Sequence, residues 1–148
     1  MDTILLSVGT SSALKGKASF SAFTPLANPP LTDNLATAFA RVAAERGTHF
    51  IAETQSGDYS YECILRAALS VRRYLCSRSD YRVGASVALQ LANSPEYLAA
   101  FYGTLLADCV VMPLPVTIES ARRNKIYELC PPFALLTRAK DFSDKTAV

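Results

Sequence analysis

The chain has 148 residues, of which 50% are hydrophobic and 19% are charged, and its formal net charge is +2. This length suits one domain with its own core, and the composition excludes an intrinsically disordered chain. So small a net charge argues against a nucleic-acid or membrane-surface partner.

Residues 1–31 are rich in Ser, Thr, Ala and Pro and end in Asn28-Pro29-Pro30. We expect a leader of low regularity here, followed by one unit over residues 32–148. The apolar start lacks a basic n-region and carries Asp2, so we expect no secretory signal and a cytoplasmic protein without a membrane span.

A helix is predicted next, capped by Thr32, with Leu35, Phe39 and Val42 at helical spacing and Gly47 at its end. Residues 49–53 predict a strand, and residues 55–58 predict a turn. Tyr59 and Tyr61 are expected on a short returning strand, which would complete a β-hairpin.

A second helix follows, with an apolar stripe at helical spacing that comprises Tyr61, Ile64, Leu65, Ala68, Val71 and Leu75. Glu62 precedes Arg66 by four residues, the favourable order for a helical ion pair. Four arginines follow, and a solvated helix face with its adjoining loop explains them better than a nucleic-acid patch does: Arg72, Arg73, Arg78 and Arg82.

From residue 84 onward the pattern predicts strand, helix, strand, helix, strand. Strands are expected near 86–91, 109–113 and 133–137, with helices that begin at Ser94-Pro95 and at Thr117. The apolar positions Ile118, Ala121, Ile126 and Leu129 are expected on one face of the second of these helices. Gly103 lies inside the helix that begins at Ser94-Pro95, and a glycine at this position predicts close backbone packing.

Two right-handed crossovers of this kind make a parallel sheet, so the predicted fold class is α/β: a partial doubly wound βαβαβ sheet preceded by a helix, a hairpin and a second helix. Ligands of such sheets bind beyond the carboxyl ends of the strands. Here that edge comprises residues 92–94, 114–116 and 137–138.

No residue can be assigned to catalysis, cofactor binding or metal binding. The six glycines are scattered, so no loop offers a phosphate cradle. Ser94 lacks the flanking glycines of a nucleophile elbow, and capping explains it better. Asp80, Asp108 and Glu119 are single carboxylates without an obvious partner.

The cysteines Cys63, Cys76, Cys109 and Cys130 are too far apart in sequence for a zinc knuckle or a redox dithiol. Each lies in an apolar run, so we expect reduced cysteines in the core. The single histidine, His49, has no clustered partner, and a structural role is expected for it.

Four segments resemble, in order, motifs of the acyl-activating, AMP-forming ligases. These are residues 59–64 (YSYECI), 83–87 (VGASV), 93–96 (NSPE) and 105–114 (LLADCVVMPL). The family includes acyl-CoA synthetases, fatty acyl-AMP ligases and nonribosomal-peptide adenylation domains. Asp108 and Ala85 depart from the family's usual glycine and aspartate, which suggests a divergent member.

The resemblance implies the N-terminal part of an enzyme that joins a carboxylic acid to ATP and passes the acyl group from AMP to a thiol. It implies ATP and Mg2+ for the full-length parent, and coenzyme A or a carrier protein as acceptor. The family's Gly-rich loop and later motifs do not occur before Val148, so we expect the fragment alone to be inactive. The expected partner of this fragment is the remaining ligase chain, or a second copy of the fragment through self-association.

The alternative is a self-standing, non-catalytic α/β module that binds a protein partner. A reading frame that continues into a Gly-rich loop would favour the ligase, whereas a natural stop codon would favour the module. The sequence does not reveal which acid is activated.

Overall fold

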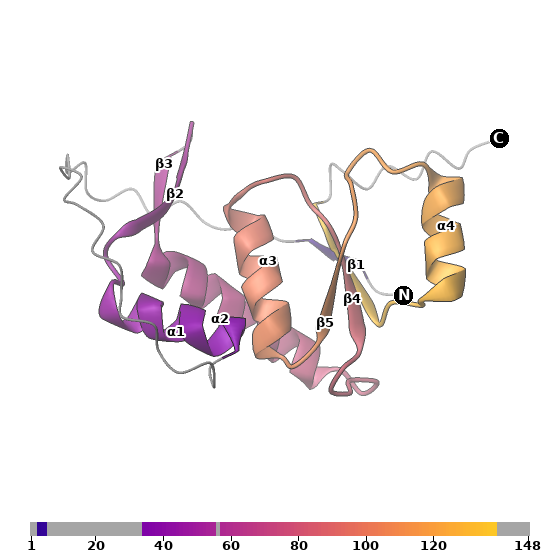
Figure 1. The fold of residues 1–148 in the computed structure, drawn as a ribbon, viewed down its shortest axis with the longest axis horizontal. Coiled ribbons are helices and arrows are strands. Elements are labelled where there is room, and N and C mark those ends of the chain that lie inside the picture. Colours follow the sequence, from indigo (N-terminus) through magenta and orange to yellow (C-terminus); the bar gives the residue numbers. More distant parts are fainter. Residues whose placement is uncertain (1–2, 6–33, 56, 139–148) are drawn as a thin grey trace.

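A computed structural model of the protein describes residues 3–5, 34–55 and 57–138 (Figure 1). The elements in chain order are β1 (Thr3–Leu5), α1 (Leu35–Glu45), β2 (Phe50–Thr54), β3 (Gly57–Ser60), α2 (Tyr61–Ser77), β4 (Ser86–Gln90), α3 (Pro95–Leu106), β5 (Val110–Pro113), α4 (Ser120–Leu129) and β6 (Ala134–Thr137). The predicted α/β class and the predicted order of elements are confirmed.

The main sheet has the strand order β1-β6-β4-β5, and all its neighbouring strands are parallel. Ala88 in the central strand β4 pairs with Met112 on one side and with Leu135 on the other. The helices α3 and α4 are the crossovers between β4, β5 and β6, as predicted from the alternation of apolar runs and capped helices.

The strand β1 is an element that the sequence did not predict. Its backbone pairs with β6, from Thr3 beside Leu135 to Leu5 beside Thr137. The other residues of the expected leader, 1–2 and 6–31, and the expected cap Thr32 lie outside the described residues.

The cap of α1 is Asn34, which corrects the prediction of Thr32. Its side-chain oxygen Oδ1 accepts a hydrogen bond from the backbone N–H of Thr37 at 2.9 Å. An asparagine satisfies one of the open N–H groups of the first turn as well as a threonine would. The buried Phe39 then stacks on Tyr102 of α3, with ring centroids 3.7 Å apart.

The hairpin is confirmed as the antiparallel pair β2 and β3, but Tyr61 begins α2 and does not continue the returning strand. The Ser60 hydroxyl accepts from the N–H of Cys63 at 3.2 Å, and this cap starts the helix at Tyr61, the first residue of the predicted helical stripe. The predicted ion pair of Glu62 and Arg66 is present at 3.1 Å.

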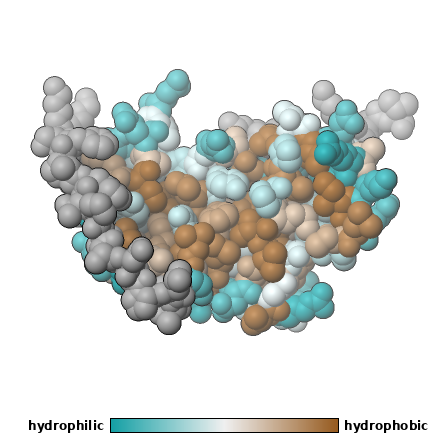
Figure 2. Space-filling model, in the orientation of Figure 1, coloured by the Kyte–Doolittle hydropathy of each residue, from teal (hydrophilic) through white to brown (hydrophobic). Residues whose placement is uncertain are grey.

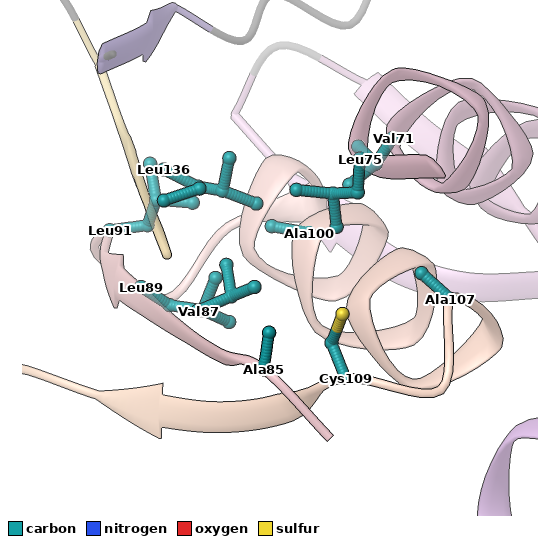
Figure 3. Close-up of a cluster of buried hydrophobic side chains, with 11 residues drawn as sticks. Val71, Leu75, Ala85, Val87, Leu89, Leu91, Ala100, Ala107, Cys109 and Leu136 are labelled. Atoms are coloured by element: carbon teal, nitrogen blue, oxygen red, sulfur yellow. The ribbon is translucent and has the colours of Figure 1, made fainter. Parts of the chain in front are cut away.

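The largest core cluster lies between the sheet and the helices α2 and α3 (Figure 3). Its buried members are Val71, Leu75, Ala85, Val87, Leu89, Leu91, Ala100, Ala107, Cys109, Ala134 and Leu136. The predicted stripe of α2 is therefore confirmed at its inner positions. None of the helices in the described part of the chain combines the length and apolar character that crossing a bilayer requires.

The helix α4 covers the opposite face of the sheet and differs from the prediction. It begins at Ser120, three residues after Thr117, and the N-cap residue Glu119 makes no side-chain capping bond. Ile118 and Ile126 pack against the sheet as expected, whereas Leu129 is 81% exposed. Ala121 is exposed as well, and Leu129 is the last residue of the helix, so the predicted apolar face is wrong at both of these positions.

Candidate functional site

The carboxyl edge of the parallel sheet is the candidate site, because ligands of open α/β sheets bind there. The strands β4, β5 and β6 end at Gln90, Pro113 and Thr137. Of the segments predicted to form this edge, residues 92–94 and 114–116 follow their strands, and residues 137–138 begin at the last residue of β6.

Gln90 joins the ends of the strands beneath this edge. Only 3% of it is exposed, and its Nε2 donates to the carbonyl of Val116 at 3.2 Å. The buried hydroxyl of Thr137 donates to the carbonyl of Gln90 at 3.0 Å. The edge therefore has a buried polar layer, although Oε1 of Gln90 has no hydrogen-bond partner among the described residues.

The helix α3 begins at the same edge, and Ser94 caps it as predicted. The Ser94 hydroxyl accepts from the N–H of Tyr97 at 3.3 Å, and Pro95 occupies the first helical position. Glu96 in the first turn forms an ion pair with Arg138, the residue that follows β6. The sequence motif placed Glu96 at the helix start, but nothing in it indicated Arg138 as the partner.

The Glu96 carboxyl is charged at neutral pH. Burial acts to raise its pKa, but hydrogen bonds from its own backbone N–H and from Arg138 and Ser94 outweigh burial and lower the pKa below the ordinary value. The side chains of Glu96 and Arg138 are only 15% and 24% exposed, so the pair is poorly screened. The electropositive end of α3, a position that suits a phosphate, thus holds the protein's own carboxylate.

The glycines of the described segments lie away from this edge. Gly47 follows α1, Gly57 lies in the hairpin, Gly84 precedes β4 and Gly103 packs inside α3. Within residues 3–5, 34–55 and 57–138, no three His, Cys, Asp or Glu side chains are grouped so that they could hold a metal ion. The residues placed here do not fit a magnesium site or a backbone phosphate cradle.

The expectation of core cysteines is correct for Cys109, which is buried, and wrong for Cys76 and Cys130, which are exposed; Cys63 is half-buried. All four are free thiols, as predicted. The two exposed thiols lie on the outer turns at or beyond helix ends, where an apolar run in sequence does not face the core. His49 is exposed, and its carbonyl accepts from the N–H of Tyr61.

The arginines that follow the α2 stripe do not form one patch. Arg78 is mostly buried, bonds Asp80 at 3.0 Å and lies 4.8 Å from the ring centre of Phe133, which corrects its assignment to a solvated face. Arg72 remains exposed and donates to the carbonyl of Leu106 at 2.9 Å. Both side chains therefore tie α2 and its following loop to neighbouring elements.

Comparison with protein families matches residues 39–148 to the family described as AMP-binding enzyme. A curated relative, the hybrid PKS-NRPS synthetase lepA of Aspergillus flavus, is 38% identical over 52 residues, which is 35% of this chain and 1% of that protein. The chain thus spans only a small fraction of this relative's length.

Solved structures share the fold. The anthranilate CoA ligase AuaEII, in complex with anthranoyl-AMP, aligns with 76% of this chain and 22% of its own at a TM-score of 0.68 and 18% identity. The AMPPNP-bound nonribosomal peptide synthetase FmoA3 aligns with 77% of this chain and 12% of its own chain, at a TM-score of 0.70 and 22% identity. MatB from Rhodopseudomonas palustris aligns with 68% of this chain and 20% of its own chain, at a TM-score of 0.59 and 26% identity.

Proposed function

The chain belongs to the AMP-binding enzyme family, and we propose that it is the N-terminal part of a cytoplasmic AMP-forming ligase that activates a carboxylic acid. One observation carries the proposal: the family match over residues 39–148 coincides with the hairpin and the parallel sheet with its two crossovers. In this proposal residues 1–31 are a leader and residues 32–148 are an incomplete subdomain.

The proposed reaction has two steps. An oxygen of the substrate carboxylate attacks the α-phosphorus of ATP, which forms an acyl-AMP and releases pyrophosphate. A thiol then attacks the acyl carbonyl, so that a thioester forms and AMP leaves. The similarity to an anthranilate CoA ligase and to nonribosomal peptide synthetases supports either coenzyme A or a carrier protein as the thiol.

The described residues would contribute a scaffold to this reaction. Stabilising charge on a reacting phosphate takes aimed donors or a metal ion, and each lost donor costs about 3–4 kcal/mol. At the carboxyl edge the cation Arg138 is already paired with Glu96. We therefore propose that this chain alone forms no acyl-adenylate, and that the groups that hold ATP and Mg2+ belong to the rest of the ligase.

The test is exchange of labelled pyrophosphate into ATP, measured with a panel of fatty, aromatic and amino acids. We expect background exchange from the 148-residue chain, and exchange with at least one acid when the chain is joined to the rest of a ligase. Exchange by the repurified chain alone would contradict the scaffold role. No exchange by the joined protein would contradict the ligase assignment.

A second candidate, a non-catalytic module that binds a protein partner, is favoured by the exposed apolar side chains of Val83 and Leu129. The downstream reading frame separates the two. Continuation into a Gly-rich phosphate loop supports the ligase, whereas a natural stop codon with a stable product supports the module.

A further inference from the structure

We propose that the outer face of α2 binds an acidic segment of a partner protein, in a hollow that carries two arginines. The hollow has a volume of about 450 Å³, and side chains of α2 line it: Leu69, Arg72, Arg73, Cys76 and Ser77. We call it the α2 hollow. The inference goes beyond the proposed function, since the segment is neither a substrate nor the remainder of the ligase.

The α2 hollow faces away from the core and lies toward the amino ends of the strands. Val71 and Leu75, on the inner face of α2, point toward α3 and the sheet (Figure 3). Arg72 bonds the carbonyl of Leu106, the last residue of α3. Because α3 begins at the carboxyl edge and ends just before β5, about the length of α3 separates the hollow from the candidate site.

The α2 hollow is electropositive. Residues 63–79 contain four arginines and no Asp or Glu. Two of these arginines pair with Glu62 and Asp80, whereas Arg72 and Arg73 form no ion pair with any residue that the structure describes. Figure 2 shows hydrophilic residues along the lower margin of the molecule, where the end of α2 emerges below α3 in Figure 1. The hollow therefore holds two positive charges without a counter-charge.

Arg72 is held in place for a ligand. Its Nε donates to the carbonyl of Leu106 at 2.9 Å, and its two terminal nitrogens have no hydrogen-bond partner in the described part of the chain. Asp108, two residues after Leu106, forms no ion pair with Arg72 there either. A guanidinium fixed through Nε loses little further freedom on binding, and its terminal N–H groups match the two oxygens of a carboxylate.

The shape of the α2 hollow suits a chain segment better than a small molecule. Small-molecule sites enclose most of their ligand, whereas among the described residues a single helix lines this hollow, which opens to solvent. Leu69 and Ser77 are about 12 Å apart along the helix axis, the length of about four residues of an extended chain. Leu69 is 42% exposed and adds an apolar contact. An acidic segment that also carries an apolar residue complements these groups.

The experiment measures how the 148-residue chain binds a fluorescein-labelled peptide in which a leucine stands between two pairs of glutamates. The control peptide carries glutamine in place of each glutamate. Fluorescence anisotropy in low salt should show that the acidic peptide binds and the neutral peptide does not. Added salt should weaken the binding, because exposed charges are screened.

Arg73→Glu should weaken binding of the acidic peptide by at least roughly tenfold, because it places a like charge in the α2 hollow. Arg122→Glu is the matched control: it changes the net charge equally, but Arg122 is exposed on α4, across the sheet from α2, so the affinity should be unchanged. Arg73 makes no bond to the described residues, so urea unfolding of Arg73→Glu should match that of the parent chain. This match separates a binding defect from unfolding.

The thiol of Cys76 reports occupancy of the α2 hollow without any substitution. Cys76 lines the hollow, whereas Cys130, a second exposed free thiol, follows α4. A saturating amount of the acidic peptide should slow the labelling of Cys76 by iodoacetamide and leave the labelling of Cys130 unchanged. Mass spectrometry after timed quenching measures both rates.

Four outcomes of these measurements overturn the proposal: equal binding of the two peptides, equal loss of affinity in Arg73→Glu and Arg122→Glu, no protection of Cys76, or displacement of the labelled peptide by inorganic phosphate as readily as by unlabelled peptide. The last would assign the arginines to a small anion. Sedimentation with phosphatidylserine vesicles that depends on Arg73 and exceeds peptide binding would overturn it in favour of a lipid surface. Pyrophosphate exchange enters none of these measurements, so their failure leaves the proposed function standing.

Discussion

Gly103 of α3 lies directly against Val71 of α2. A Cβ atom added to Gly103 would lie 2.6 Å from the Cβ of Val71 and 2.6 Å from the carbonyl oxygen of Ala68. Real Cβ atoms essentially never approach other atoms so closely. The contact between these two helices therefore depends on a missing side chain, as the sequence predicted for this glycine.

Gly103→Ala should destabilise the protein. Forcing a methyl group into a packed contact costs about 1–3 kcal/mol, and the neighbour Ala68 offers a backbone oxygen that cannot rotate away. The better helix propensity of alanine offsets about 1 kcal/mol of this. Urea unfolding should show a net loss. The exposed Asn124→Ala of α4 is the control and should change stability by less than about 0.5 kcal/mol.

The ion pair of Glu96 and Arg138 should make stability depend on pH. Because the folded pKa of Glu96 is lowered, its contribution is complete above the ordinary value of 4.5 and is lost as the pH falls through the lower folded value. Glu96→Gln should cost about 1–2 kcal/mol at pH 7, and this difference should vanish in acid. The free energy of unfolding of the parent chain and of Glu96→Gln is measured by urea unfolding at several pH values from 7 to 3.

The control for this experiment is Glu119→Gln, since Glu119 is exposed and makes no capping bond. Its stability difference from the parent should stay small at every pH. A difference for Glu96→Gln that is constant from pH 7 to pH 3 would contradict the assigned role of the charge.

Ser94→Ala should lower stability by about 1 kcal/mol, because the N–H of Tyr97 loses its acceptor. Ser120→Ala is a matched control, since Ser120 is the exposed first residue of α4, whose start has no side-chain cap. Thermal unfolding of the two variants should separate them by several degrees. Equal melting temperatures would count against the cap.

The thiols should differ in reactivity. Burial first, and then the charges of Cys76 and Asp108, raise the pKa of the Cys109 thiol. Because the thiolate is the reactive form, iodoacetamide at pH 8 should label the exposed Cys76 and Cys130 well before Cys109. Mass spectrometry after timed quenching measures this order. In urea all four cysteines should react, and equal native rates would contradict the burial of Cys109.

The elements with strong local signals were predictable from sequence. The stripe of α2, the Ser94-Pro95 start of α3 and the three apolar strands depend on spacing and caps that act over a few residues. The start of α4 was not, because Thr117 is a good cap by type but lies in a turn closed by a hydrogen bond from the N–H of Ile118 to the carbonyl of Pro115 at 3.1 Å. Asn34 and Thr32 were likewise equivalent as caps on local grounds.

The candidate site was predictable only as a location. The strand order placed the edge at residues 92–94, 114–116 and 137–138, but the pairing of Glu96 with Arg138 joins residues 42 positions apart. No local pattern encodes such a contact. The hydrogen bond from Gln90 to Val116 was equally unpredictable, since a glutamine inside an apolar run does not indicate which residue it will bond.

The pairing of β1 with β6 has a consequence for the order of folding. Thr3 and Leu135, register partners in this pairing, are 132 positions apart, so nearly the whole chain must loop back before the first bond forms. The entropy lost in closing a loop grows with its length, whereas β4 and β5 are separated by a single helix. The pair β4–β5 should therefore assemble early and β1 should join last. A chain that emerges from the ribosome would hold its first strand unpaired until β6 has been made.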